Sequence, residues 1–224
     1  MNDNSTFSQP PYDLDTKGTR TMKAMVRLAK QVYKGDKSGH DFGHIKRVLK
    51  YSKTIWKHEH IGGDFTTIKI SVLFHDVHRI MQNKSGIYTP PEDSIEEVKK
   101  LLQRFNLKPK VLKDVLYIIK NHSNEEIETT MPELKIVQDA DTLDAMGKRA
   151  LKRSKKYCIA HGIPITNSAV PLDTPEYIPD VNPISSQHYV YRTMIPQAQM
   201  LQTKTAQKLA STKIKALLKF ANKK

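Results

Sequence analysis

Histidine and aspartate residues that could bind a metal ion gather in three short stretches, SGHDFGHIKRV (38–48), LFHDVHR (73–79) and IVQDADTLDAMG (136–147). The residues concerned are His40, Asp41, His44, His75, Asp76, Asp139, Asp141 and Asp144. Apolar residues surround the second and third stretches, where a carboxylate is costly to bury unless it is paired or bound to a cation. Each stretch alone is compatible with a buried structural histidine or a solvated acidic turn. Together they offer imidazoles and carboxylates that suit a divalent ion such as Mn, Fe, Zn or Co, with positions left for water and substrate.

The three stretches fall on separate predicted helices, because apolar residues recur at helical spacing in and around each of them. Ser38 could cap the first of these helices, with Asp41 three residues further on. Neighbouring side chains on a helix point about 100° apart. His75 and Asp76 can therefore share one ion if their helix approaches it end-on or obliquely.

The rest of the sequence predicts an all-α fold. Pro109 fits the first turn of a helix that ends near His122, and residues 134–160 form one or two further helices. Residues 162–184 are rich in proline and lack periodicity, which predicts an irregular loop that could act as a lid. Ser185 or Ser186 then opens a long C-terminal helical pattern that continues through Phe220.

These patterns predict one folded domain over residues 18–224, preceded by a polar segment, 1–17, that we expect to be disordered. Within the domain, the metal-site core spans about 38–147 and a C-terminal lid and helix region spans about 162–224. Hydrophobic residues make up 38% of the 224 residues, enough for a sizeable core.

Composition favours a cytoplasmic protein with anionic partners. The single cysteine, Cys158, excludes an internal disulfide, and no apolar run resembles a signal peptide or a membrane span. The net charge of +14 favours nucleotides, polyphosphates or nucleic acid. The densest basic block, residues 148–156, has no aromatic side chains interleaved for stacking single-stranded bases, so it indicates a solvated helix face more than a nucleic-acid site.

The ordered set of motifs resembles the HD-domain metal-dependent phosphohydrolases, which share an H…HD…D signature, and is most similar to their small bacterial cytoplasmic branch. HDFGHIKRV resembles the opening motif H-D-x-x-H-x-x-R-V of that branch, and LFHDV resembles the second motif. IIKNHS resembles a middle motif, VQDADTLDAMG the closing D-A-D-x-L-D-A, and HYVYRTM part of the C-terminal tail. The resemblance covers about residues 20–220 and implies an HD-type helical bundle.

This resemblance implies that four residues bind one divalent ion, namely His44, His75, Asp76 and Asp141. Mn is the first expectation for that ion, with Co, Fe, Zn or Mg as alternatives, and His122 could help to hold a second ion. Asp76 is also expected to orient the attacking water, and the other expected catalytic residues are His122, Asp144 and Asp41. Asp41 is a candidate to fix the tautomer of a ligand histidine or to contact the substrate. The candidate substrate or phosphate contacts are His40, Lys46, Arg79, Lys120, Arg153 and His188.

The implied function is hydrolysis of a nucleotide, with release of phosphate or pyrophosphate. A cyclic-nucleotide or oligonucleotide phosphodiesterase is an alternative on the same fold. A binding module for nucleotides or nucleic acid, without catalysis, is a second alternative. The sequence departs from the branch at Arg149 and Ala150, which leaves the substrate open, and it leaves the oligomeric state open as well.

Overall fold

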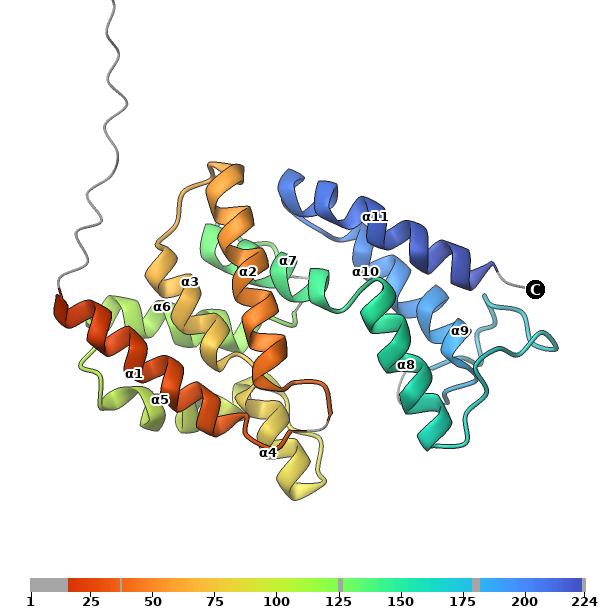
Figure 1. The fold of residues 1–224 in the computed structure, drawn as a ribbon, viewed down its shortest axis with the longest axis horizontal. Coiled ribbons are helices and arrows are strands. Elements are labelled where there is room, and N and C mark those ends of the chain that lie inside the picture. The colour runs from red at the N-terminus through yellow and green to blue at the C-terminus, as the bar shows by residue number, and fades with distance from the viewer. Residues whose placement is uncertain (1–15, 37, 125–126, 179–181, 223–224) are drawn as a thin grey trace, which may run out of the picture.

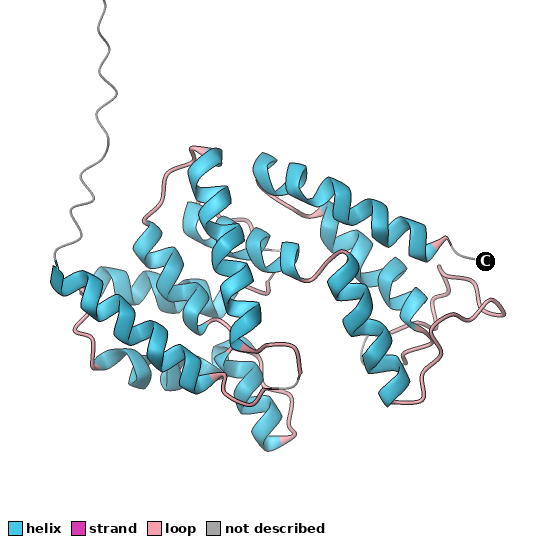
Figure 2. Ribbon diagram, viewed as in Figure 1, coloured by secondary structure: helices cyan, strands magenta, loops and turns pink. Residues whose placement is uncertain are grey.

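The computed structural model describes residues 16–36, 38–124, 127–178 and 182–222 (Figure 1). These residues fold into helices joined by loops, without a strand, which confirms the all-α prediction (Figure 2). The N-terminal helices are α1 (Thr16–Val32), α2 (Phe42–Glu59), α3 (Phe65–Phe74), α4 (Val77–Ser85), the 3-10 helix η1 (Pro91–Ser94), α5 (Ile95–Gln103), α6 (Pro109–Asn121) and α7 (Pro132–Asp144). The C-terminal helices are α8 (Lys148–Ala160), α9 (Ser186–Tyr189), the π-helix η2 (Val190–Met194), α10 (Ile195–Gln199) and α11 (Lys204–Ala221).

One hydrophobic core joins these helices. It includes Met25 on α1, Ile45 on α2, Ile118 on α6 and Leu217 on α11, each fully or almost fully buried. In Figure 1, helices α1–α7 form one group and α8–α11 a second group beside it, connected through the turn between α7 and α8. Burial of this core is the main force that brings the three His/Asp stretches together.

The turn between α7 and α8 depends on Gly147, whose φ is +84°. A side chain at this position would be strained, and its Cβ would lie 3.2 Å from Cγ of Lys213 on α11. Lys213 also donates a hydrogen bond to the carbonyl of Leu143, at 2.8 Å, so α11 packs closely against this turn. Gly147 therefore fixes how α8 leaves the end of α7.

The C-terminal pattern predicts one long helix, and the structure differs in one respect. The segments α9, η2 and α10 follow one another without a gap, but the chain leaves the helix after Gln199 and α11 begins at Lys204. Ser185 does cap α9, as expected, by accepting a hydrogen bond from the backbone N–H of His188. Thr203 caps α11 in the same way, through the N–H of Ala206. Each cap provides an acceptor for one backbone donor in the first turn of its helix.

Asp139 holds the turn before α11 onto α7. Its buried carboxylate accepts hydrogen bonds from the backbone N–H of Gln202 at 2.9 Å and of Thr203 at 2.7 Å, and from the Thr203 hydroxyl at 2.6 Å. Glu59, at the end of α2, accepts from the N–H groups of Lys204 and Thr205. These two carboxylates attach the C-terminal helix to the metal-site core.

The expected disordered segment, 1–17, lies outside the described residues except for Thr16 and Lys17, which begin α1. Most of the Pro-rich loop 162–184 is described and is irregular, as predicted. It returns to α9 through hydrogen bonds from Ser186 N to Pro164 O and from Gln187 N to Ile165 O. No described helix combines the length and apolar character needed to cross a bilayer.

Replacing Asp139 with Ala should destabilise the fold, because it leaves the buried donors of residues 202 and 203 without their acceptor. We expect a loss of about 1–3 kcal/mol in the free energy of unfolding, measured by urea denaturation. Asp173→Ala, at an exposed loop position, is the matched control and should change stability little. Equal stability of the two variants would contradict the role of Asp139.

Candidate metal centre

Four side chains from α2, the α3–α4 junction and α7 meet at one point. His44 Nε2 lies 3.2 Å from His75 Nε2, 3.1 Å from Asp76 Oδ2 and 3.3 Å from Asp141 Oδ1. His75 Nε2 lies 3.3 Å from Asp76 Oδ2 and 3.7 Å from Asp141 Oδ1. Ligand atoms about 2.1 Å from one ion are about 3.0–3.4 Å apart in octahedral or tetrahedral geometry. The cluster therefore has the dimensions of a site for one divalent ion.

A break in the helix lets the adjacent His75 and Asp76 reach the same point. Helix α3 ends at Phe74, α4 begins at Val77, and Asp76 has φ −93° and ψ 16°, outside the helical range. The expectation was one helix that carries both residues and approaches the ion end-on or obliquely. It is wrong in that the helix does not carry them, because α3 ends at Phe74 and both ligands lie just beyond its end. The chain changes direction between the two ligands, and this removes the problem that neighbouring helical side chains diverge.

Hydrogen bonds fix both ligand histidines so that Nε2 faces the centre. Nδ1 of His44 lies 2.8 Å from Asp144 Oδ2, and Nδ1 of His75 lies 2.9 Å from the carbonyl oxygen of Val72. Both acceptors require a proton on Nδ1, which leaves the lone pair of Nε2 for a metal ion. The donor set therefore fits a divalent cation in chemistry as well as in dimensions.

Asp144 connects His44 to Arg47, a residue to which the sequence analysis assigned no role. The Arg47 guanidinium donates to Asp144 through Nε at 2.7 Å and through an η nitrogen at 2.9 Å. Arg47 neutralises Asp144, so Asp76 and Asp141 remain to balance the charge of a divalent ion. Its position three residues after His44, on the same side of α2, was the signal that could have identified it.

The carboxylates of the cluster control its protonation. Burial lowers the pKa of His44, but Asp141, Asp144 and Asp76 together raise it to about 12. Burial likewise opposes protonation of His75, and the same charges of Asp76 and Asp141 raise its pKa to about 10. Burial raises the pKa of Asp76 and Asp141, yet the surrounding histidines hold both well below the usual range. Without a metal ion, the two imidazoles thus carry protons that balance the carboxylates.

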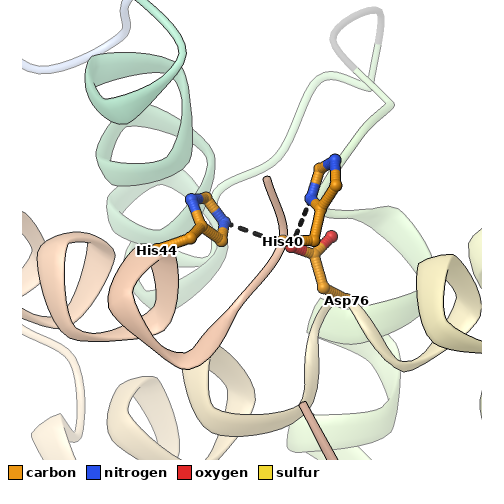
Figure 3. A group of neighbouring side chains, drawn as sticks. All are labelled: His40, His44 and Asp76. Carbon is orange, nitrogen blue, oxygen red and sulfur yellow. Dashed lines mark hydrogen bonds and ion pairs between the residues drawn. The ribbon is translucent and has the colours of Figure 1, made fainter. Parts of the chain in front are cut away.

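Asp41 and His40 have different positions from those expected. Asp41 is the N-cap of α2, where its carboxylate accepts from the backbone N–H of His44 at 2.8 Å. The prediction that Asp41 fixes a ligand tautomer is wrong, because Asp144 does so. Ser38 is not the cap, and its hydroxyl donates instead to Asp36. His40 precedes the helix, and its Nδ1 lies 2.7 Å from Asp76 Oδ2, at the edge of the cluster (Figure 3).

His122 lies behind His75, with their ring centroids 5.0 Å apart. Its Nδ1 donates to the carbonyl of Ile119 at 2.7 Å, and burial together with the charge of His75 lowers its pKa to about 4. Ligand atoms of His75, Asp76 and His122 all lie within 4.8 Å of one another. The sequence analysis did not select His78, whose ring centroid lies 5.4 Å from that of His122. Burial lowers the pKa of His78 to about 3. Both histidines are therefore neutral and form the wall behind the metal ligands.

The remaining candidate phosphate contacts differ in their burial and in the residues that they contact. Lys46 and Lys120 are exposed, and Arg79 donates to the side chain of Gln82 at 3.3 Å. Arg153 is half-buried against Gly39, in the loop that carries His40. His188 is fully buried, and its ring nitrogens contact the Ser185 hydroxyl at 2.8 Å and the carbonyl of Pro171 at 3.2 Å. The structure thus places His188 within the protein as a support for the 162–184 loop.

Replacing Asp144 with Asn should weaken metal binding without removing a ligand. The amide cannot balance Arg47 and holds the Nδ1 proton of His44 less strongly, so we expect affinity for Mn²⁺ to fall about 10–100-fold. Isothermal titration calorimetry measures the change, and Asp114→Asn, on the exposed side of α6, provides the control. Unchanged affinity in Asp144→Asn would show that this contact does not orient His44.

Metal binding should release protons. At pH 7 the metal-free protein holds protons on both His44 and His75, since their pKa values are about 12 and about 10, whereas metal ligation needs neutral imidazoles. We therefore expect release of about two protons per ion and an affinity that rises with pH throughout the range from about 6 to about 9, because both pKa values lie above it. Titrations in buffers of different ionisation enthalpy count these protons. An affinity independent of pH between 6 and 9 would contradict the assignment.

Comparison with known proteins agrees with this geometry. Residues 41–146 match the family model of the HD domain. An HD-superfamily hydrolase from Bacillus thuringiensis is 26% identical over 92% of this chain and 94% of that chain, with a TM-score of 0.69. The Lin1889 protein from Listeria innocua is also 26% identical, over 92% and 94% of the two chains, with a TM-score of 0.68.

YpgQ from Bacillus subtilis, which is 22% identical over 92% of this chain and 94% of its own, shares the fold with a TM-score of 0.69. No protein of curated function matches the chain. The family match spans all four ligand positions, and the structural similarity extends over nearly the whole chain. Residues 41–146 of this chain therefore form an HD domain, and the chain as a whole shares its fold with a solved HD-superfamily hydrolase.

Proposed function

We propose that this protein is a metal-dependent phosphohydrolase that acts on a nucleotide and releases phosphate or pyrophosphate. The observation that carries the proposal is the convergence of His44, His75, Asp76 and Asp141, with both imidazoles fixed to present Nε2. A divalent ion bound there would supply a water of lowered pKa and would polarise a phosphoryl oxygen.

The cluster is open on one side only. The side chains of His44, His75 and Asp76 are 5%, 0% and 4% exposed, whereas those of His40 and Asp141 are 31% and 30% exposed. A substrate would therefore approach from the side of His40 and Asp141. The protein excludes water from the opposite side, where His122 and His78 are buried.

His40 is the residue best placed to contact the substrate. Asp76 holds its Nδ1, and its other ring nitrogen points away from Asp76 (Figure 3). That nitrogen could bind a phosphate oxygen at the open side of the cluster. Asp76 thus has two roles in the proposal, as a ligand and as the group that orients His40.

A nucleotide substrate is supported by the charge around the site. The chain carries a net charge of +14, and α8, which follows directly after the Asp141 and Asp144 segment, exposes Arg149, Lys152 and Lys156. Such a surface attracts polyanions and speeds their approach. The related fold of Bacillus subtilis YpgQ has been solved in complex with ADP.

The proposal predicts divalent-dependent hydrolysis of nucleotides that is lost in His75→Ala. Removing this ligand should lower turnover by about 100-fold or more, because the site loses its ion. A panel of nucleoside mono-, di- and triphosphates, assayed with Mn²⁺, Co²⁺, Mg²⁺ or EDTA, measures the activity, and product analysis separates phosphate or pyrophosphate release from opening of a cyclic nucleotide. His58→Ala, an exposed histidine on α2, is the control. Activity of His75→Ala equal to that of the control would refute the proposal.

A further inference from the structure

A cavity of about 220 Å³ lies between α8, the 162–184 loop and the π-helix η2. Its lining is mainly aromatic and apolar, with three tyrosines and a few hydroxyl groups. The residues that form this lining include Tyr157, Tyr177, Tyr189, Ile163, Met194 and Ser185. Pockets for whole drug-sized ligands measure about 300–1,000 Å³. This cavity therefore suits one ring system, the end of a larger molecule.

The cavity borders the metal centre through the loop that carries His40. Ser38 lines the cavity, and His40, two residues later, contacts Asp76. Two residues span at most about 7 Å of chain. A molecule with its ring in the cavity could therefore reach the open side of the metal centre with an attached phosphate chain.

Arg153 lies between the cavity and the loop that carries His40. It lines the cavity, and its side chain packs so closely on Gly39 that a Cβ there would lie 2.8 Å from Arg153 Cδ. A second, more open hollow shares Arg153, Ser38 and Tyr157 with the cavity and adds the cationic side chains of Arg149, Lys152 and Lys156. Positive charge thus follows the route from the cavity toward the metal centre.

The walls of the cavity are held in place by the protein itself. The buried His188 ring stacks on Tyr177, with centroids 6.1 Å apart, while its nitrogens contact Ser185 and the carbonyl of Pro171. On the opposite wall, the hydroxyl groups of Ser154 and Ser186 are 2.8 Å apart and join α8 to α9. All of the lining residues lie outside the matched HD domain, Ser38 before residue 41 and the others after residue 146.

We propose that this cavity binds the base of the nucleotide substrate, with Arg153 contacting its phosphates and the tyrosines stacking on its ring. The assignment rests on the proposed function and specifies its substrate as a nucleotide that is recognised at both ends. Planar heterocycles stack well on tyrosine rings, and a few polar groups fix their orientation. His188 acts as a positioning residue for the tyrosine wall.

The test compares binding of ATP, GTP and inorganic tripolyphosphate to the protein in EDTA, where turnover stops, by isothermal titration calorimetry. The quantity measured is the preference, meaning the Kd of tripolyphosphate divided by the Kd of the nucleotide. Ile163→Trp fills the cavity and should lower this preference about tenfold or more. Ile159→Trp, on the exposed side of α8 at 70% exposure, is the matched control and should keep it.

A second pair of variants covers the case in which Ile163→Trp fails to fold. Tyr157→Ala removes a half-exposed tyrosine from the cavity and should also lower the preference about tenfold. Tyr191→Ala, an exposed tyrosine of η2 that does not line the cavity, should leave it unchanged.

Base binding and hydrolysis can fail separately. The base site is overturned if the wild-type protein does not prefer nucleotides to tripolyphosphate, or if neither cavity variant changes the preference. If the preference behaves as expected but the wild-type protein with Mn²⁺ releases neither phosphate nor pyrophosphate, the base site is supported and the proposed hydrolysis fails.

Discussion

The neutralisation of three carboxylates in a largely buried cluster is the constraint on which this structure depends. Asp76, Asp141 and Asp144 each lie within 3.3 Å of a ring nitrogen of His44, where their mutual repulsion would be costly. Arg47 balances Asp144, and protons or a divalent ion must balance the other two. Nearly every polar contact around the centre follows from this requirement, including the fixed tautomer of His44 and the pairing of His40 with Asp76.

The requirement also explains why the helices end where they do. Asp141 and Asp144 occupy the last turn of α7, a helix terminus that disfavours negative charge, so nearby cations are needed there. The break between α3 and α4 brings His75 and Asp76 to the same end of the bundle. The C-terminal helices are attached separately, through Asp139 and Glu59, whose carboxylates bind backbone donors instead of the metal cluster. Carboxylates close in sequence therefore serve different purposes, because different partners surround them.

The chemistry of the site could be predicted from the sequence more fully than its geometry. His44, His75, Asp76 and Asp141 were identifiable because their residue types, apolar surroundings and order are informative without coordinates. The break at residues 75–76 was not, since the apolar pattern continues through it and tertiary packing decides where the helix ends. Arg47 was not selected because its partner, Asp144, is distant in sequence, although its spacing from His44 places both residues on one side of α2. His78 was not selected because its contact with His122 arises only in the folded interior. The misplaced role of Asp41 followed from treating a capping residue as part of the helix.

Gly147 connects α7, which belongs to the metal centre, to α8, which lines the cavity. Its left-handed backbone sets the angle between α7, which carries Asp141, and α8, which carries Arg153. A side chain there would strain the backbone and place its Cβ 3.2 Å from Cγ of Lys213, so the turn between α7 and α8 would have to adjust. In the proposed binding mode, the distance between the cavity and the metal ligands therefore depends on a residue that does not line the cavity. A substitution at Gly147 would change the spacing between the cavity and the metal ligands without replacing any of those ligands. Evolution could in this way change which substrates fit the protein while the metal centre keeps its composition.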